Sequence, residues 1–298
     1  MSPRIALATA RAARGLDEDM APLLAALQAA GARPSAVDWD DPSVDWAAFD
    51  LVLPRSTWDY SERLPAFMDW LGTVGACTRL LNPVPVLRWN IDKHYLATLA
   101  AAGVTIVPSR FVEPGDDATA HLDALLAAHP ASADVVVKPA VGAGSRDAER
   151  HPRTARAAAL AHIGRLLAAG RSALLQPYLD GVDARGETAL VHFDGVFSHA
   201  IRKGPLLQRA AAATQALFAA EDIRARAADA DEQALARQVL AALPFDSAPV
   251  YARVDLIRAD DGTPCLLELE LIEPSLFLDH APVAATRFAA CLMRHLAR

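Results

Sequence analysis

Two neighbouring stretches near the end of the chain, YARVDLIR (251–258) and CLLELEL (265–271), decide the fold. Apolar and polar residues alternate in both, and the turn sequence Ala259-Asp260-Asp261-Gly262 between them is a strong hairpin signal. Because successive side chains of a strand point to opposite faces, Arg253 and Asp255 share one face and their apolar neighbours share the other. The sequence therefore predicts a hairpin with one apolar and one charged face.

The second stretch adds two carboxylates to the charged face. Glu268 and Glu270 share one face of their strand, and the leucines beside them point the other way. If the apolar faces of both strands join one core, three carboxylates and a guanidinium meet on the opposite face. Two carboxylates about 4 Å apart repel each other by roughly 4 kcal/mol at an effective dielectric constant near 20. Mg²⁺ removes that repulsion and commonly shares its oxygen ligands with nucleotide phosphates, so the hairpin is a candidate Mg²⁺ site. The alternative is an amphipathic hairpin with a solvated charged face.

Composition excludes several classes of protein. The net charge of −7, without a block of like charges, disfavours a nucleic-acid partner. The three scattered cysteines suggest neither a zinc site nor a disulfide framework, which favours a reduced cytoplasm. The N-terminus lacks the apolar core of a signal peptide, and no uncharged apolar run reaches about 18 residues, so we expect no membrane span.

Strand and helix signals alternate along the chain and predict an α/β (α+β) protein with three domains. The first, 1–103, is an N-terminal α/β domain whose last helix is capped by Gly103. The second, 104–176, is a small domain around a Gly-rich loop, and the third, 177–298, contains two hairpins. The expected strands are Arg4–Ala8, Leu51–Leu53, Ile106–Val112, Asp134–Lys138, Ala173–Pro177, Glu187–Phe193 and Val196–Lys203, and the expected helices are Met20–Ala30, Glu62–Val74, Asp92–Ala102, Thr119–Ala128, Arg153–Ala169, Ala227–Ala242 and Val283–Leu296.

The small domain carries a loop suited to phosphate. The strand VVVKP (135–139) ends in Lys138, and Gly142, Gly144 and Ser145 follow within a run of small residues. Such a loop lets the backbone approach phosphate oxygens closely, and the lysine adds a point charge. It matches neither the P-loop nor the dinucleotide fingerprint, and a plain turn is the alternative. Lys93 and Lys203 would each, taken singly, be ordinary solvated lysines; their order along the chain is the informative feature.

That order, with the carboxylate hairpin last, resembles the ATP-grasp superfamily of carboxylate–amine ligases over roughly residues 80–278. The resemblance implies an ATP-grasp fold in which the small domain is a lid, with ATP and Mg²⁺ as cofactors. Many relatives have Asn where this chain has Glu270, which adds a negative charge and leaves the number of metal ions open. The implied nucleotide-binding residues are Lys93, Lys138, Gly142, Gly144, Ser145, Gln176, Tyr178, Leu179, Asp183 and Lys203; Arg253 and Lys203 are the implied catalytic residues, and Asp255, Glu268 and Glu270 the implied metal ligands.

A narrower resemblance rests on RSTWDY (55–60), RGETALVHFDGVFSHAIRKGP (185–205) and ELELIEPSLFL (268–278). These stretches are similar to prokaryotic glutathione-synthetase-like enzymes and, within them, to the cyclo-ligases that close O-ureido-D-serine to D-cycloserine in antibiotic biosynthesis. The glycine-free segment Pro205–Asp222 departs from the substrate loop of many relatives, which leaves the substrate open.

Residues 55–60 follow an apolar strand at its carboxyl end, where open α/β sheets bind ligands. We therefore expect substrate contacts from Arg55, Ser56, Thr57 and Asp59, with Arg55 on the carboxylate and Asp59 on the ammonium group of an amino acid. The alternative is a structural loop packed by its aromatic residues.

The resemblance implies that a substrate carboxylate takes the γ-phosphoryl group of ATP and that a nitrogen nucleophile then displaces phosphate. Such a transfer needs positioning and charge neutralisation, which the lysines, Arg253 and the metal would supply. The expected partner is a small amino-acid substrate. An intermolecular ligase and a non-catalytic ATP-binding regulator of the same fold remain alternatives, and the oligomeric state, with a homodimer as one option, is left open.

Overall fold

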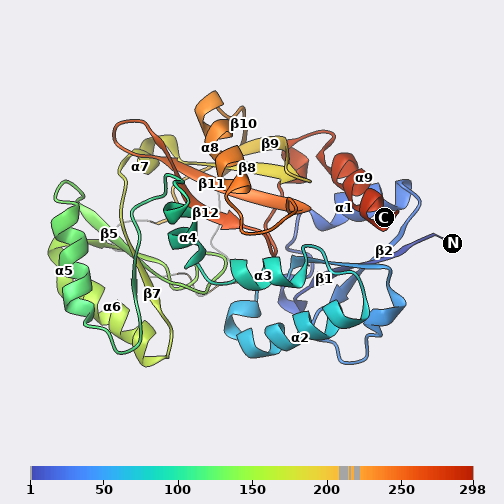
Figure 1. Cartoon of the computed structure of the whole chain (residues 1–298), viewed down its shortest axis with the longest axis horizontal. Helices are drawn as coiled ribbons and strands as arrows, with labels where there is room; N and C mark the ends of the chain where they lie inside the picture. Colours follow the sequence, from blue (N-terminus) through green and yellow to red (C-terminus); the bar gives the residue numbers. More distant parts are fainter. Residues whose placement is uncertain (1, 208–213, 215, 218–221, 298) are drawn as a thin grey trace.

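The computed structural model describes residues 2–207, 214, 216–217 and 222–297. Within these residues the strands form three sheets, of three, four and five strands (Figure 1). The segment 208–213, residue 215 and the segment 218–221, which belong to the glycine-free segment after Lys203, lie outside the described residues. No helix in the described part of the chain is both long and apolar enough to cross a bilayer.

The N-terminal sheet is parallel, with the strand order β2-β1-β3. Its middle strand and β3 are almost wholly buried, as their apolar sequences predict. The sequence analysis missed β2, because this edge strand is largely exposed and has no apolar pattern. The sheet and its two long helices comprise β1 (Arg4–Thr9), β2 (Arg33–Asp38), β3 (Leu51–Ser56), α1 (Met20–Ala29) and α2 (Leu64–Cys77).

Two short helices, α3 (Val84–Asn90) and α4 (Tyr95–Ala101), follow the N-terminal sheet. The sequence predicted only a break at 82–85 and one helix from Asp92. Instead α3 begins inside that proline-rich stretch, because a proline is well tolerated in the first turn of a helix.

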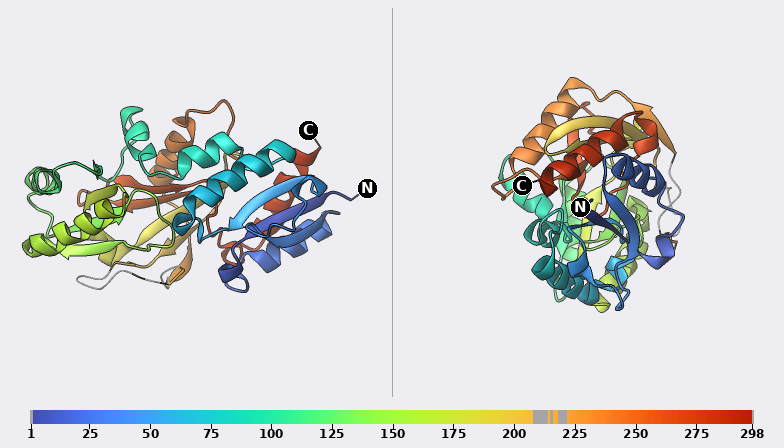
Figure 2. Two further views of the ribbon diagram at one scale, coloured as in Figure 1. Left: turned by 90° about the horizontal axis from the view of Figure 1, so that it is seen from below. Right: turned by 90° about the vertical axis from the view of Figure 1, so that its right-hand side faces the viewer.

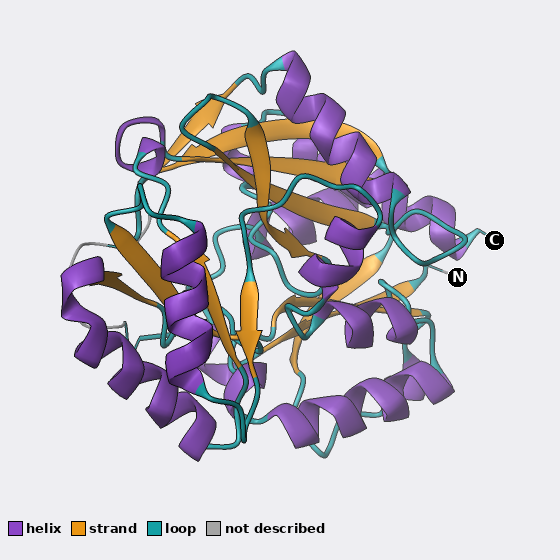
Figure 3. Cartoon of the chain, turned by 60° about the vertical axis from the view of Figure 1, so that its left-hand side comes forward, coloured by secondary structure: helices purple, strands orange, loops and turns teal. Residues whose placement is uncertain are grey.

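The small sheet is antiparallel, with the order β4-β7-β5-β6, and α5 and α6 cover its outer side (Figure 3). The predicted strand Ile106–Val112 is split: only its last three residues join this sheet, while Thr105 and Val107 exchange backbone hydrogen bonds with Leu266. The elements are β4 (Arg110–Val112), α5 (Ala118–Ala128), β5 (Asp134–Pro139), β6 (Glu149–Pro152), α6 (Arg156–Ala168) and β7 (Ala173–Pro177).

The large sheet is antiparallel throughout, with the order β10-β9-β8-β11-β12. Both predicted hairpins are present, β8–β9 and β11–β12. The elements are α7 (Gly181–Arg185), β8 (Glu187–Phe193), β9 (Val196–Lys203), β10 (Ile223–Arg226), α8 (Ala230–Ala241), β11 (Tyr251–Arg258), β12 (Pro264–Glu270) and α9 (Ala284–Leu296); short 3-10 turns lie at Arg11–Ala13, Trp46–Ala48, Tyr60–Glu62, Arg153–Ala155 and Leu278–His280.

The small sheet and the N-terminal sheet lie at opposite ends of the molecule, and the two chain ends lie close together (Figure 2). The last helix, α9, returns to the N-terminal sheet and packs against α1. Phe288 and Leu292 of α9 share one buried cluster with Ile5, Leu27 and Leu53 of the N-terminal elements.

Two buried asparagines join the N-terminal half to the large sheet. Asn82 Nδ2 donates to the carbonyls of Tyr251 and Leu271 (3.0 and 2.7 Å), and its Oδ1 accepts from the amide of Val250 (2.7 Å). Asn90 donates to one backbone group of the β12 region and accepts from another, at 2.8 and 2.7 Å. These side chains satisfy buried backbone groups that would otherwise have no partner, and so they fix the position of β12.

We expect Asn82→Ala to destabilise the protein by at least about 3 kcal/mol, because it leaves one backbone donor and two acceptors buried without partners. Chemical denaturation with a fluorescence readout measures the change. Thr73→Ala, which removes an exposed hydroxyl from neighbouring α2, is the control and should stay within about 0.5 kcal/mol of wild type. Equal effects of the two changes would contradict this role of Asn82.

Candidate active site

The β11–β12 hairpin brings its four charged residues together. Its register places Asp255 beside Glu268 and Arg253 beside Glu270. The apolar residues between them belong to a buried cluster on the other face of the sheet. The alternation in the sequence thus produces a charged face above a core. Arg253, Glu268 and Glu270 line a cavity of about 340 Å³, and Asp255 lies buried behind them.

Asp255 is the centre of the charge network. Arg253 binds it through two hydrogen bonds, Nε to Oδ1 and Nη2 to Oδ2, both 2.9 Å long. Lys203 Nζ lies 2.7 Å from the same Oδ2 and 3.0 Å from Glu187. Burial raises the pKa of Asp255, but Arg253 and Lys203 outweigh it and lower the pKa to about 2. Asp255 is therefore an anion at neutral pH.

Glu268 connects the hairpin to two further lysines. Lys93 Nζ lies 2.9 Å from Glu268 Oε1 and donates a 2.9 Å hydrogen bond to the carbonyl of Gly142. Burial raises the pKa of Glu268, and Lys93 and Lys138 more than reverse this, so the pKa falls below its usual value. Burial lowers the pKa of Lys138, an effect that Glu268 opposes. The structure thus brings a cation of the small sheet next to a carboxylate of the large sheet.

The cavity also holds carboxylates that resist ionisation. Burial raises the pKa of Glu270 to about 7, although Arg253 pairs with it. Glu273, which is 8% exposed, has a pKa well above its usual value because of burial and the nearby Glu270. Crowded buried carboxylates that lack enough positive charge are a donor set that suits a hard divalent cation with oxygen ligands. Glu270 meets this description, and Asp255 and Glu268 lie beside it as carboxylates whose present partners are lysines and an arginine. The three supply the oxygen donors that Mg²⁺ prefers, and the ion would share them with these cations.

The loop after β5 forms one wall of the cavity. Lys138, Gly142, Gly144 and Ser145 all line it. Gly144 and Ser145 have φ angles of 63° and 59°, a left-handed conformation that costs glycine little. Arg146 of the same loop forms an ion pair with Glu62 of the N-terminal part. This wall therefore has few side chains and two positive charges.

The end of β7 forms the opposite, more apolar wall. Gln176, Tyr178 and Leu179 line the cavity there. Asp183, which the resemblance implies as a nucleotide-binding residue, does not line the cavity. Its carboxylate accepts hydrogen bonds from Arg150 Nη1 at 3.1 Å and from the Tyr178 hydroxyl at 2.5 Å. Asp183 therefore orients Tyr178 in this structure.

Arg55 does not lie in the cavity, contrary to the sequence-based expectation. Its side chain has no exposed surface, and it bonds to Asp19 (Nη2–Oδ2, 3.1 Å) and to the carbonyl of Pro274 (2.9 Å). The physical reason is that β3 is buried along its whole length, so a charged residue at its end finds its partners inside the protein. Arg55 supports the cavity wall from behind.

The neighbouring residues that were predicted to contact the substrate also lie outside the cavity, behind its wall. Ser56 shares a 2.8 Å hydrogen bond with Thr9, and Thr57 is fully buried. Asp59 accepts a 2.8 Å hydrogen bond from Trp39 Nε1 and pairs with Arg63 at 3.2 Å. These contacts match the alternative of a structural loop. Trp58 and Tyr60 of the same stretch do line the cavity.

Sequence reasoning missed several lining residues. Asp17, Glu18 and Asp19 follow β1 at its carboxyl end, and Glu273 and Ser275 follow β12. The acidic run after the first strand was the available signal, because ligands of open α/β sheets gather at carboxyl ends of strands. Asp19 also accepts hydrogen bonds from the amides of residues 276–278 and so shapes the loop that carries Ser275.

We expect Arg55→Leu to lower the free energy of unfolding by about 3–5 kcal/mol, because it leaves the carboxylate of Asp19 buried without its cation. Arg63→Leu is the matched control. It breaks ion pairs with Asp40 and Asp59 on the surface, where the arginine side chain is 42% exposed, and should cost less than about 1 kcal/mol. Denaturation curves of the two variants measure their free energies of unfolding. Similar decreases in the two variants would refute the structural role of Arg55.

Comparisons with known proteins agree with this architecture. A family model described as the N-terminal domain of D-cycloserine synthetase DcsG matches residues 5–82. The cycloserine biosynthesis protein DcsG of Streptomyces lavendulae is 43% identical to this chain over 296 residues, which is 98% of each protein. The crystal structure of D-cycloserine synthetase DcsG superposes with a TM-score of 0.92, covering 98% of this chain and 99% of that one.

More distant structures bear on the fold alone. D-alanine–D-alanine ligase from Bacillus anthracis matches with a TM-score of 0.70 at 15% identity, covering 100% of this chain and 98% of that one. The ATP-grasp ligase PsnB, complexed with a minimal precursor, matches with a TM-score of 0.66 at 19% identity over 99% of each chain. The ATP-grasp fold predicted from the sequence is confirmed. The chain belongs to the DcsG family of ATP-grasp ligases.

Proposed function

We propose that this ligase uses ATP to close O-ureido-D-serine to D-cycloserine. The observation that carries the proposal is the end-to-end similarity to a D-cycloserine synthetase, at 43% identity over 98% of both proteins. The cavity supports it, because its lysines and carboxylates meet around a space of about 340 Å³. The D configuration of the substrate comes from this similarity.

The reaction balances with one water molecule. The substrate carboxylate takes the γ-phosphoryl group of ATP, which gives ADP and an acyl phosphate. The ureido nitrogen bonded to oxygen attacks the acyl carbon, forms the ring amide and releases phosphate. Water then removes the carbamoyl group as carbon dioxide and ammonia. Acid and nucleophile belong to one molecule, so no second amine site is needed.

In this proposal Lys93, Lys138 and Lys203 bind the phosphates of ATP. Arg253 would direct its guanidinium charge toward the migrating phosphoryl group and the acyl-phosphate oxygens, while its Nε and Nη2 keep their hydrogen bonds to Asp255. Asp255, Glu268 and Glu270 would hold Mg²⁺, which when bound neutralises phosphate charge. Lys203 and Arg253 already contact Asp255, so the cations are held in place before the substrate arrives.

We further propose the division into an N-terminal domain (1–103), a lid (104–176) and a C-terminal domain (177–298). The lid would cover ATP with the Gly142–Ser145 loop, and the wall formed by Gln176, Tyr178 and Leu179 would take the adenine. Asp183 would reach the ribose only if it left Arg150. The three cysteines, all in the described part of the chain, form no disulfide with one another, which suits a reduced cytoplasm.

The amino-acid end of the substrate needs one cation and one anion. Because Arg55 and Asp59 lie behind the wall, we assign these roles to Arg253 and to the acidic residues that line the cavity. Glu18 is such a residue, because it lines the cavity and is exposed, whereas burial raises the pKa of Glu273 well above its usual value. The substrate carboxylate at Arg253 would lie beside the phosphate-binding lysines, as phosphoryl transfer requires.

We expect Glu268→Gln to lower kcat at least about 100-fold, the size of effect seen when one group that stabilises the transition state is removed. The change keeps the size of the side chain but removes a charge that would bind the metal. ADP release with saturating Mg²⁺ and ATP is the measurement. Glu232→Gln, which alters a buried glutamate outside the cavity, is the control for folding and should keep wild-type kcat. Turnover of Glu268→Gln within about twofold of wild type, or ~0.4 kcal/mol, would contradict the metal assignment.

We expect O-ureido-D-serine to support ADP release with no added amine, at one ADP per cyclic product. Coupled ADP detection and mass spectrometry of the product measure this ratio, and the L enantiomer is the control. ADP release that requires a second amine would overturn cyclisation and favour an intermolecular ligase. ATP binding without ADP release from any amino acid would favour the non-catalytic regulator.

A further inference from the structure

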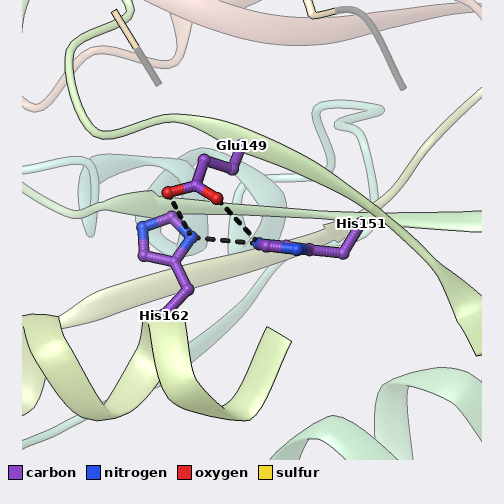
Figure 4. Close-up of side chains that lie close together, drawn as sticks. All are labelled: Glu149, His151 and His162. Carbon is purple, nitrogen blue, oxygen red and sulfur yellow. Dashed lines mark hydrogen bonds and ion pairs between the residues drawn. The ribbon is translucent and has the colours of Figure 1, made fainter. Parts of the chain in front are cut away.

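Three side chains of metal-binding type converge in the small sheet, outside the ATP cavity. Glu149 and His151 lie on β6, and His162 lies on α6, which packs against that strand. Figure 4 shows the two imidazole rings and the carboxylate pointing toward one another. One ligand atom from each residue lies within 4.8 Å of the others. None of the three residues lines the cavity described above.

The distances within this cluster suit a single small cation. His151 Nε2 and His162 Nδ1 are 3.1 Å apart. Glu149 Oε2 lies 3.7 Å from His151 Nε2, and the other carboxylate oxygen, Oε1, lies 3.7 Å from His162 Nδ1. In a tetrahedral site with bonds of about 2.1 Å, ligand atoms lie about 3.4 Å apart. These separations lie on either side of that value, and a rotation of the Glu149 carboxylate would bring one of its oxygens toward both nitrogens.

Burial keeps both imidazoles in the form that binds metals. His162 is 0% exposed and His151 is 6% exposed. Burial lowers the pKa of His162 to about 4 and that of His151 below its usual value, and in both cases it outweighs the opposing effect of Glu149. Both rings are therefore neutral at pH 7, and a neutral imidazole is the ligand form.

A hydrogen bond between the rings is the competing explanation, and it accounts for less of the geometry. In a hydrogen bond between the rings, only one of the two facing nitrogens uses its lone pair, because the other carries the proton. A metal would use the lone pairs of both nitrogens. It also gives no role to Glu149, whose Oε1 accepts a 2.8 Å hydrogen bond from Arg165. That arginine side chain is 60% exposed. The Glu149 side chain is itself 17% exposed, and a metal would enter from that side.

We propose that Glu149, His151 and His162 form a binding site for a divalent first-row transition metal, with Zn²⁺ as the preferred ion and water as a fourth ligand. Imidazole and carboxylate suit Zn²⁺, while Mg²⁺ prefers oxygen ligands in octahedral geometry. The metal would tie β6 to α6. Because Ala148 lines the ATP cavity and immediately precedes Glu149, the tie would also fix the end of the Gly142–Ala148 loop.

The test uses full-length protein freed of metal by a chelator, in buffer with millimolar Mg²⁺ to occupy the ATP site. Calorimetric titration with Zn²⁺ should show one site, and Zn²⁺ should raise the thermal midpoint. His151→Gln and Glu149→Gln should each weaken Zn²⁺ binding at least about tenfold. Loss of a residue that only supports a metal ligand already costs about that much affinity. His129→Gln, in the same part of the chain but outside the cluster, is the matched control and should bind like wild type.

A second readout separates binding from folding. Co²⁺ in place of Zn²⁺ should give the visible absorption bands of a four-coordinate site in wild type and in His129→Gln. The bands should be absent in His151→Gln, even where the thermal midpoint of that variant without metal equals that of wild type. Absence of a Zn²⁺ site in wild type, or equal Zn²⁺ affinity of wild type, His151→Gln and Glu149→Gln, would overturn the proposal.

Discussion

The pairing of Arg253 with Asp255 is the interaction on which the rest of the site depends. An anion buried to 1% exposure is tolerated only with a cation in good geometry, and this arginine supplies two parallel hydrogen bonds. Lys203 approaches the same carboxylate from β9. Arg253 in turn donates to the carbonyl of Ser275 at 3.1 Å. One ion pair therefore fixes two strands and the loop after β12 relative to one another.

The positive charges around the cavity come from separate parts of the structure. Lys93 precedes α4, Lys138 lies on β5 of the small sheet, and Lys203 ends β9 of the large sheet. The three carboxylates Asp255, Glu268 and Glu270, by contrast, all lie in the large sheet. A ligand with several phosphates would therefore be held by all of these parts at once. In the proposed site, nucleotide affinity would then depend on the relative position of the sheets, as expected for the proposed lid.

The sequence predicted the hairpins well because their signals are local. Alternation and the Asp194-Gly195 turn define β8 and β9, whose ends agree with the prediction, and both turn residues have positive φ. The fold class was predictable for the same reason, together with the order of the lysines. The edge strands β2 and β10 were missed because both are mostly exposed and lack an apolar pattern.

The substrate end of the site was not predictable from local signals. Whether Arg55 faces a cavity or the interior depends on Asp19, which lies 36 residues away in sequence. Its second partner, the carbonyl of Pro274, is 219 residues away. A pattern within one strand cannot indicate such partners. The position of Glu273 in the cavity wall could not be predicted from local sequence either, because it depends on the path of the chain after β12.

The position of α9 has a consequence for the order of events during protein synthesis. This helix contributes Phe288 and Leu292 to the cluster that contains Ile5, Leu27 and Leu53. The first strands leave the ribosome long before their covering helix does. Their apolar surface stays open to solvent, or to chaperones, until α9 has been made. Premature termination before Phe288 would therefore leave uncovered the apolar surface of elements that were made long before it.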